Sequence, residues 1–255
     1  MGADVSRAEA YRMFKLRIKM ENLREVVEVV STLVSEVKLS VSKDGLEAKA
    51  VDPSHVAMLV LKLQKAVFEE FTGEPTEIGV DVEKLKEVLR LSKPGDVIDL
   101  QFDGKNRLVA NVGRITRQMA VVDPAGITDP KVPNVSPPAS VTLKTEDMRQ
   151  GIRGSESFTD HVTLTLAPDA FTMHSEGDTD RLDLRIPKES LTRLDVKEPV
   201  KSMYPLDFFS AMVKSIVAEE TTLHVGNEYP LKIEFAMGAG RGEGRYLLAP
   251  RVEED

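Results

Sequence analysis

The sequence predicts an α+β protein of two similar domains, in which amphipathic helices cover one face of antiparallel sheets. The first observation is a β-α-β-β-β order of predicted elements that occurs four times along the chain, twice in each half. The second is a segment near the middle, residues 121–140, which contains five of the 14 prolines. Because each Pro fixes φ and removes a backbone donor, this segment is predicted to be an extended connector.

The first half begins with an alternating strand, MFKLRIKM at 13–20, and continues into a helix for which Asn22 is the expected N-cap. The apolar face of this helix consists of Leu23, Val26, Val27, Val30, Leu33, Val34 and Val37. VKLSVS and LEAKAV form a predicted hairpin around the turn KDG, and HVAMLVLKL adds a strand. After FTGEPTE come the strand IGVDV, a short helix with Val82, Leu85, Val88 and Leu89 on one face, and the hairpin VIDLQFDGKNRLVANV.

The second half repeats this order. SVTLKT is a predicted strand, EDMRQGIRGSESF a helix, and HVTLTLAPDAFTMHS a hairpin in which VTLTLAPDAFTMHS aligns with VKLSVSKDGLEAKAV. A second helix, with Leu206, Phe209, Met212, Val213 and Ile216 as its apolar face, precedes a final hairpin. The predicted domains are therefore residues 13–120 and 140–255, joined by a connector at 121–139, with a disordered extension at 1–12.

Composition excludes several classes of function. The 255 residues contain no Cys, which excludes disulfides, thiolate catalysis and Cys-ligated metal sites. The four His are too scattered for an obvious metal site, and no HExxH or phosphate-binding motif occurs, so no cofactor is expected. The Gly-rich run GAGRGEG at 238–244 lies between two strand-like runs and is predicted to be a hairpin loop. No apolar run approaches the roughly 18 residues that span a bilayer, and no leader is evident, so we expect a cytoplasmic protein without membrane partners.

The stretch AVDPSHVAMLVLKL at 50–63 contains Asp52, Ser54 and His55, the residue types of a hydrolytic triad. A hydrolase is one interpretation. However, neighbouring residues on an extended strand point to alternating faces and cannot converge as a triad requires. We therefore expect no catalytic residue and no enzyme.

Charge and strand edges bear on possible partners. The net charge of −8, from 34 Lys and Arg against 42 Asp and Glu, argues against nucleic acid as a partner unless the cations gather on one surface.

RITRQMAVV (114–122) and RLDLRIP (181–187) are the strands expected nearest the ends of the two sheets. Unprotected edges favour pairing with another chain, and head-to-tail pairing closes into a ring when the rotation permits. Arg114 and Arg117, with Asp178, Asp180 and Asp183, are candidates for such a subunit interface.

MFKLRI at 13–18, AVDPSHVAMLVL at 50–61, LAPRVEED at 248–255 and the doubled domain resemble the proliferating cell nuclear antigen family, in its archaeal form. The resemblance implies a homotrimeric ring around duplex DNA, lined by helices and with antiparallel sheets outside. It also implies a factor without chemical activity that tethers the replicative DNA polymerase, and whose partners include a clamp loader, flap endonuclease and DNA ligase. Such a clamp works in the cytoplasm of a prokaryote, at the nucleoid. Two alternatives stay open: a subunit of a specialised hetero-oligomeric clamp, and a β-rich scaffold ring that does not encircle DNA.

The resemblance also implies site residues. Those facing DNA are Arg24, Lys84, Lys86, Arg90, Arg149, Arg153 and Lys214, although Lys and Arg also simply solvate exposed helix faces. Because Glu25, Glu28 and Glu87 share these helices, we expect low direct affinity for DNA, which would be bound without sequence preference. Clients insert a short Gln-and-aromatic peptide into an apolar groove formed by Val51, His55, Val56, Met58, Ala125, Gly126, Ile127, Pro230, Leu247, Ala249 and Pro250. The alternative for these positions is ordinary core or turn residues.

Overall fold

The computed structural model describes residues 13–251, which form two compact units. The first unit comprises residues 13–50, Val60–Pro130 and Met237–Glu243. The second comprises Val51–Leu59, Lys131–Ala236 and residues 244–251. Each unit therefore includes a short piece of chain from the other half of the sequence. The predicted extension at 1–12 lies outside the described residues, and the domain boundaries at 120 and 140 stay a prediction.

The first half of the chain follows the predicted order of elements. These are β1 (Phe14–Lys19), α1 (Met20–Ser31), β2 (Glu36–Ser42), β3 (Gly45–Val51), β4 (Ala57–Gln64), β5 (Glu70–Gly73), β6 (Thr76–Asp81), α2 (Val82–Arg90), β7 (Val97–Phe102), β8 (Arg107–Val112) and β9 (Ile115–Ala120). The short strand β5 was not predicted. The connector that follows contains one turn of 3₁₀-helix, η2 (Pro124–Gly126).

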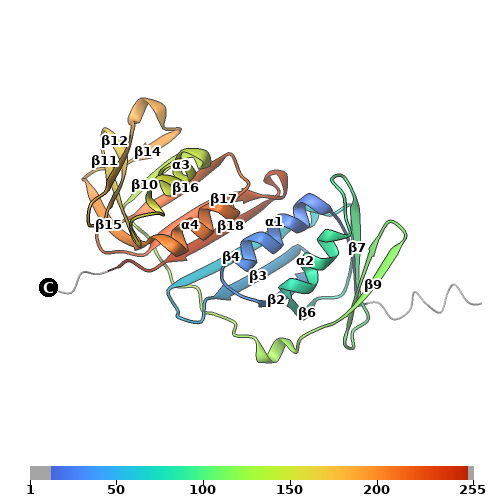
Figure 1. The fold of residues 1–255 in the computed structure, drawn as a ribbon. Helices are drawn as coiled ribbons and strands as arrows, with labels where there is room; N and C mark the ends of the chain where they lie inside the picture. The colour runs from blue at the N-terminus through green and yellow to red at the C-terminus, as the bar shows by residue number, and fades with distance from the viewer. Residues whose placement is uncertain (1–12, 252–255) are drawn as a thin grey trace, which may run out of the picture. The chain divides into compact units, whose positions relative to one another are not determined.

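The second half shows the same order again. Its elements are β10 (Ala139–Lys144), α3 (Thr145–Ser155), β11 (His161–Ala167), β12 (Ala170–Glu176), β13 (Arg181–Pro187), β14 (Arg193–Asp195), β15 (Val200–Pro205), α4 (Leu206–Ser215), β16 (Glu220–Val225), β17 (Leu231–Met237) and β18 (Gly242–Leu248). Again one short strand, β14, was not predicted. The fourfold β-α-β-β-β order and the α+β class are confirmed, and Figure 1 shows the helices side by side in pairs, α1 with α2 and α3 with α4.

The strands pair antiparallel throughout the two sheets that carry the predicted edges. One sheet has the order β5-β1-β7-β8-β9, and another has the order β13-β12-β11-β15. In the part of the chain that the structure describes, β9 pairs with β8 alone and β13 pairs with β12 alone. Both strands predicted at sheet ends are therefore edge strands. The range predicted for β13 matches, whereas the first strand is shorter than the 114–122 predicted for it.

Burial follows the period of each element. The predicted apolar faces of α2 and α4 are buried, with Val88, Phe209, Met212 and Val213 at 0% exposed. The start predicted for the first helix was wrong, because α1 begins at Met20 and its N-cap, Lys19, makes no side-chain cap. The Met20 amide instead donates to the Asp96 carbonyl (2.8 Å), so a contact with a distant loop sets this helix start.

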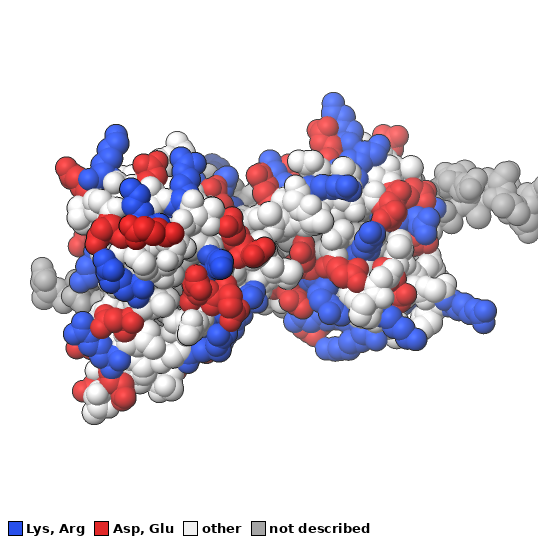
Figure 2. Space-filling model, turned by 90° about the horizontal axis from the view of Figure 1, so that it is seen from above, with Lys and Arg blue, Asp and Glu red and all other residues white. Residues whose placement is uncertain are grey.

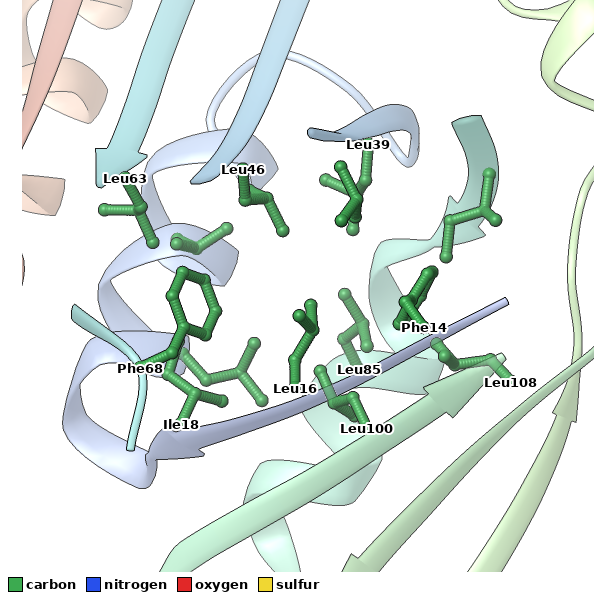
Figure 3. Close-up of a pocket in the computed structure, with 14 residues that line it drawn as sticks. Phe14, Leu16, Ile18, Leu39, Leu46, Leu63, Phe68, Leu85, Leu100 and Leu108 are labelled. Carbon is green, nitrogen blue, oxygen red and sulfur yellow. The ribbon is translucent and has the colours of Figure 1, made fainter. Parts of the chain in front are cut away.

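The core of the first unit contains an enclosed cavity of about 30 Å³. Figure 3 shows Phe14, Leu39, Leu85 and other apolar side chains pointing into it. A space this small with an entirely apolar lining stays dry and serves no ligand of biological size. None of the helices within 13–251 is both long and apolar enough to cross a membrane.

Candidate functional site

Asp52, Ser54 and His55, the residue types of a hydrolytic triad, lie in a turn between β3 and β4 and not on a strand. His55 has a φ of 58°, and its amide donates to the Asp52 carbonyl at 2.9 Å. The Asp52 carboxylate is buried and accepts hydrogen bonds from the Ser54 amide (2.8 Å) and the Ala57 amide (2.6 Å). The expectation that these residues lie on an extended strand was therefore wrong, because β4 begins only at Ala57. Both oxygens of Asp52 cap the backbone of the turn, which gives this residue a structural role.

The cations predicted to face DNA lie on helices α1 to α4, but most have a carboxylate partner in the same chain. On α2, Glu83 pairs with Lys86 (2.7 Å) and lies 3.9 Å from Arg90. On α3, Glu146 pairs with Arg149 (3.4 Å) and Arg153 (2.9 Å).

The pattern Glu-x-x-Lys/Arg-x-x-x-Arg thus occurs on both α2 and α3, and in each case one carboxylate lies between two cations on one helix face. Residues three and seven positions apart share a face, so this spacing could have revealed Glu83 and Glu146 in the sequence. Sequence reasoning missed both acids. It follows that each of these two clusters keeps a net positive charge of one, half of what its two cations alone would carry.

The remaining three cations differ among themselves. Lys214 on α4 pairs with Glu156, just after α3. Lys84 is half-buried, and its Nζ donates to the Ala120 carbonyl (3.4 Å). Arg24 is exposed, and its side chain makes no ion pair or hydrogen bond within residues 13–251. Arg24 is therefore the cation most available to a phosphate.

Two acids expected on the open helix faces have other partners. The Glu25 carboxylate accepts a hydrogen bond from the Gly238 amide (2.7 Å), and burial raises the pKa of Glu25. Glu87 pairs with Arg117 of β9. Glu28 is exposed on α1, as expected. Figure 2 shows basic and acidic side chains interspersed on the face in view, without a broad area of one sign.

Among the interface candidates, Arg117 and Asp183 already make ion pairs within the described chain, whereas the other three do not. Arg117 is engaged by Glu87, and Asp183 accepts from Arg181 (2.9 Å) and lies 2.8 Å from His174 Nδ1. The hydrogen bond with His174 lowers the pKa of Asp183. Arg114 and Asp178 are exposed, and neither makes an ion pair within the described chain; Asp180 is exposed too and accepts from the Thr179 hydroxyl (2.7 Å). Beside Arg114 on the β9 edge, Ile115 is 46% exposed.

Eight of the predicted groove residues belong to the second unit. The Ala249 amide donates to the Val56 carbonyl (2.8 Å), which places the end of β18 beside the turn at 52–56. The turn before Pro230 is held by a hydrogen bond from the Tyr204 hydroxyl to the Tyr229 carbonyl (2.9 Å). Apart from buried Leu247 and exposed His55, these residues are half-exposed: Val51, Val56, Met58, Pro230, Ala249 and Pro250. Half-exposed apolar side chains suit a peptide-binding surface.

The other three groove candidates, Ala125, Gly126 and Ile127, lie on the connector in the first unit. Ala125 and Gly126 are exposed, and the Asp123 carboxylate caps their 3₁₀ turn by accepting from the Ala125 amide (3.0 Å). No group of three or more potential metal ligands occurs among residues 13–251.

Comparisons with known proteins agree over most of the chain. Residues 13–123 match the family model described as proliferating cell nuclear antigen, N-terminal domain. The chain is 34% identical over 247 residues to the DNA polymerase sliding clamp of Thermoplasma acidophilum and 38% identical to that of Methanothrix thermoacetophila. Both comparisons cover 95% of this chain and 100% of the relative.

Solved structures are similar as well. A structure of A. fulgidus PCNA with the C-terminal region of FEN-1 bound has a TM-score of 0.90 at 26% identity, covering 95% of this chain and 100% of that chain. PCNA from Thermococcus kodakaraensis, at 20% identity, has the same fold with a TM-score of 0.86 over 93% of this chain and 100% of that chain.

Proposed function

This chain belongs to the proliferating cell nuclear antigen family of DNA polymerase sliding clamps, and from this premise we propose that three copies close into a ring around duplex DNA. The proposal rests on two edge strands, β9 and β13. Each pairs with a neighbouring strand on one side only within the described residues, and the two belong to different units. Pairing of β9 from one copy with β13 from the next is heterologous, and such contacts close into a ring when the rotation permits. It also covers both edges, which would otherwise invite aggregation.

In the proposed ring, α1 to α4 face the DNA. Lys and Arg side chains around a wide channel bind phosphates without contacting the base edges. Binding is therefore independent of DNA sequence, and the ring can slide. Glu83, Glu146 and Glu156 already pair with most of these cations. Direct affinity is therefore low, and encirclement rather than contact retains the clamp on its template.

The proposed partners are a replicative polymerase, a clamp loader, flap endonuclease and DNA ligase, which bind through short Gln-and-aromatic peptides. The half-exposed apolar residues around the turn at 52–56 support this proposal, and so does the relative seen with the C-terminal region of FEN-1 bound. The chain has no catalytic activity of its own in this proposal, and it works at the nucleoid in the cytoplasm. Its contribution is to keep enzymes on DNA.

Two measurements test the proposal. Light scattering on the purified protein should give about 85 kDa, three times the 28.2 kDa of the chain. Extension of a singly primed circular template by the cognate polymerase and loader should yield longer products when the protein is added.

A monomer at micromolar concentration together with unchanged product length would refute the clamp. A monomer that assembles only with other clamp subunits of the same organism would instead favour the hetero-oligomeric alternative. A stable ring that leaves polymerase products unchanged would favour the scaffold.

A further inference from the structure

The connector is attached to the first unit at two points. At the first point, the Val122 amide donates to the Gly79 carbonyl of β6 (2.8 Å). At the second, the Asp129 carboxylate lies between the ammonium groups of Lys38 on β2 (3.2 Å) and Lys49 on β3 (3.7 Å). Between these points the backbone bonds of the connector are local, such as that from the Ile127 amide to the Pro124 carbonyl (3.3 Å). Ala125 and Gly126 are exposed, whereas half-buried Ile127 lies over Gly79, so the polar attachments of this segment to the sheet are at its two ends.

The second attachment is more than a chance surface ion pair. Lys38 and Lys49 are directly opposite each other in the β2–β3 ladder, and like charges in that position destabilise a sheet. Glu77 offsets part of the repulsion at 3.6 Å from Lys38, and Asp129 is the one carboxylate within 4 Å of both ammonium groups in the described chain. The Lys38 side chain is only 14% exposed, whereas the Asp129 side chain is 51% exposed, so solvent screens this pair in part. The hydrogen bond from Lys38 lowers the pKa of Asp129, which keeps it ionised.

We propose that Asp129, Lys38 and Lys49 form an electrostatic latch that positions connector residues 125–127 for client peptides, with Asp129 as the positioning residue. The inference rests on the proposed role of this segment in peptide binding. Releasing the latch frees one end of the segment while leaving the Gly79 contact in place. The segment then samples more conformations, and each bound peptide must order it again, which weakens binding.

The test compares Asp129→Asn, which removes the charge, with Asp129→Glu, which retains it. Asp169→Asn is the matched control, because Asp169 pairs with Arg185 (2.7 Å) in the second unit, away from the connector. Hydrogen exchange of the Ala125 and Ile127 amides measures how often the connector opens locally when no peptide is present. Fluorescence anisotropy with a short uncharged peptide carrying Gln and two aromatic residues reports binding, at about 0.1 M and about 1 M salt.

For Asp129→Asn we expect faster exchange at both amides and about fivefold weaker peptide binding at low salt. The affinity ratio between wild type and this variant should approach one at high salt, because the Debye length falls from about 10 Å to about 3 Å. Asp129→Glu should restore most of the affinity, and Asp169→Asn should match wild type.

Three results would overturn the latch. One is an Asp129→Asn variant with wild-type exchange and affinity. Another is faster exchange with unchanged affinity, which would leave Asp129 an anchor without a positioning role. A third is an affinity ratio that does not change with salt. Failure of the proposed function is distinct from all three, because the wild-type protein itself would then not bind the peptide.

Discussion

Replacing Gly79 with Ala should detach the connector from the sheet beneath it. Gly79 lies on β6, opposite Lys38, and its backbone is in the extended region where Ala is not strained. A Cβ added there would lie 2.5 Å from the Val122 carbonyl oxygen and 2.9 Å from the Ile127 Cδ1. Since ordinary contacts are at about 3.5 Å, the connector backbone must retreat by about 1 Å. The absent side chain of Gly79 is thus what lets the connector approach.

The size of the effect follows from what this movement breaks. The Val122 amide loses its 2.8 Å bond to the Gly79 carbonyl, a net loss of about 0.5–1.5 kcal/mol. Looser packing of Ile127 adds to this. Ala also reduces the entropy of the unfolded chain, which stabilises by about 0.4–1 kcal/mol. Global stability should therefore change by less than about 1 kcal/mol, whereas loss of the hydrogen bond alone should make the connector open locally about 2–13 times more often.

Hydrogen exchange at the Val122 amide, measured alongside thermal unfolding, separates the two effects. Gly126→Ala is the matched control in the same connector, since its added Cβ meets nothing within 4 Å. The control should leave Val122 exchange unchanged and stability equal or slightly higher. If Gly79→Ala left Val122 exchange within a factor of two of wild type, the steric argument would be wrong.

Three further predictions concern DNA, acid and assembly. Glu146→Gln should free two arginines of α3 and tighten duplex binding several-fold at low salt, measured by anisotropy. An equal effect of Glu47→Gln, on strand β3 and not on a helix, would show that net charge alone is responsible. The hydrogen bond with His224 lowers the pKa of Glu234 to about 2, so its stabilisation is present above the unfolded pKa of 4.5 and is lost as pH falls toward 2. Glu234→Gln should therefore lower the free energy of unfolding, measured by urea denaturation at pH 7, by about 1–2 kcal/mol, a value discounted because the side chain is partly exposed. A difference between the two proteins that persisted near pH 2 would contradict this. Arg114→Glu, at an exposed position that has no ion pair within residues 13–251, should lower the trimer fraction in light scattering, and an unchanged trimer would remove Arg114 from the interface.

Local patterns predicted the elements well where the signal is itself local. The apolar face of α4 and the hairpin around the DG turn depend on residues within a few positions of one another. The errors fall where the deciding contact is distant. The start of α1 depends on the Asp96 carbonyl, and the two short strands β5 and β14 have too few residues for a readable alternation. The turn at 52–56 is an exception, because the two oxygens of buried Asp52 cap amides only two and five positions further along the chain.

Residue order determines some features that bear on function, and tertiary contacts determine others. The sequence was sufficient for the fourfold repeat, the two edge strands, the lack of thiol chemistry and the family, because each of these is a property of residue order and composition. Tertiary structure was needed to show that Lys214 is paired with Glu156, 58 positions away, and what holds the connector. Lys38 and Asp129 are 91 positions apart, and no periodicity relates them. Their contact exists only because the fold returns the connector to the outer face of β2, where two opposed lysines require an anion.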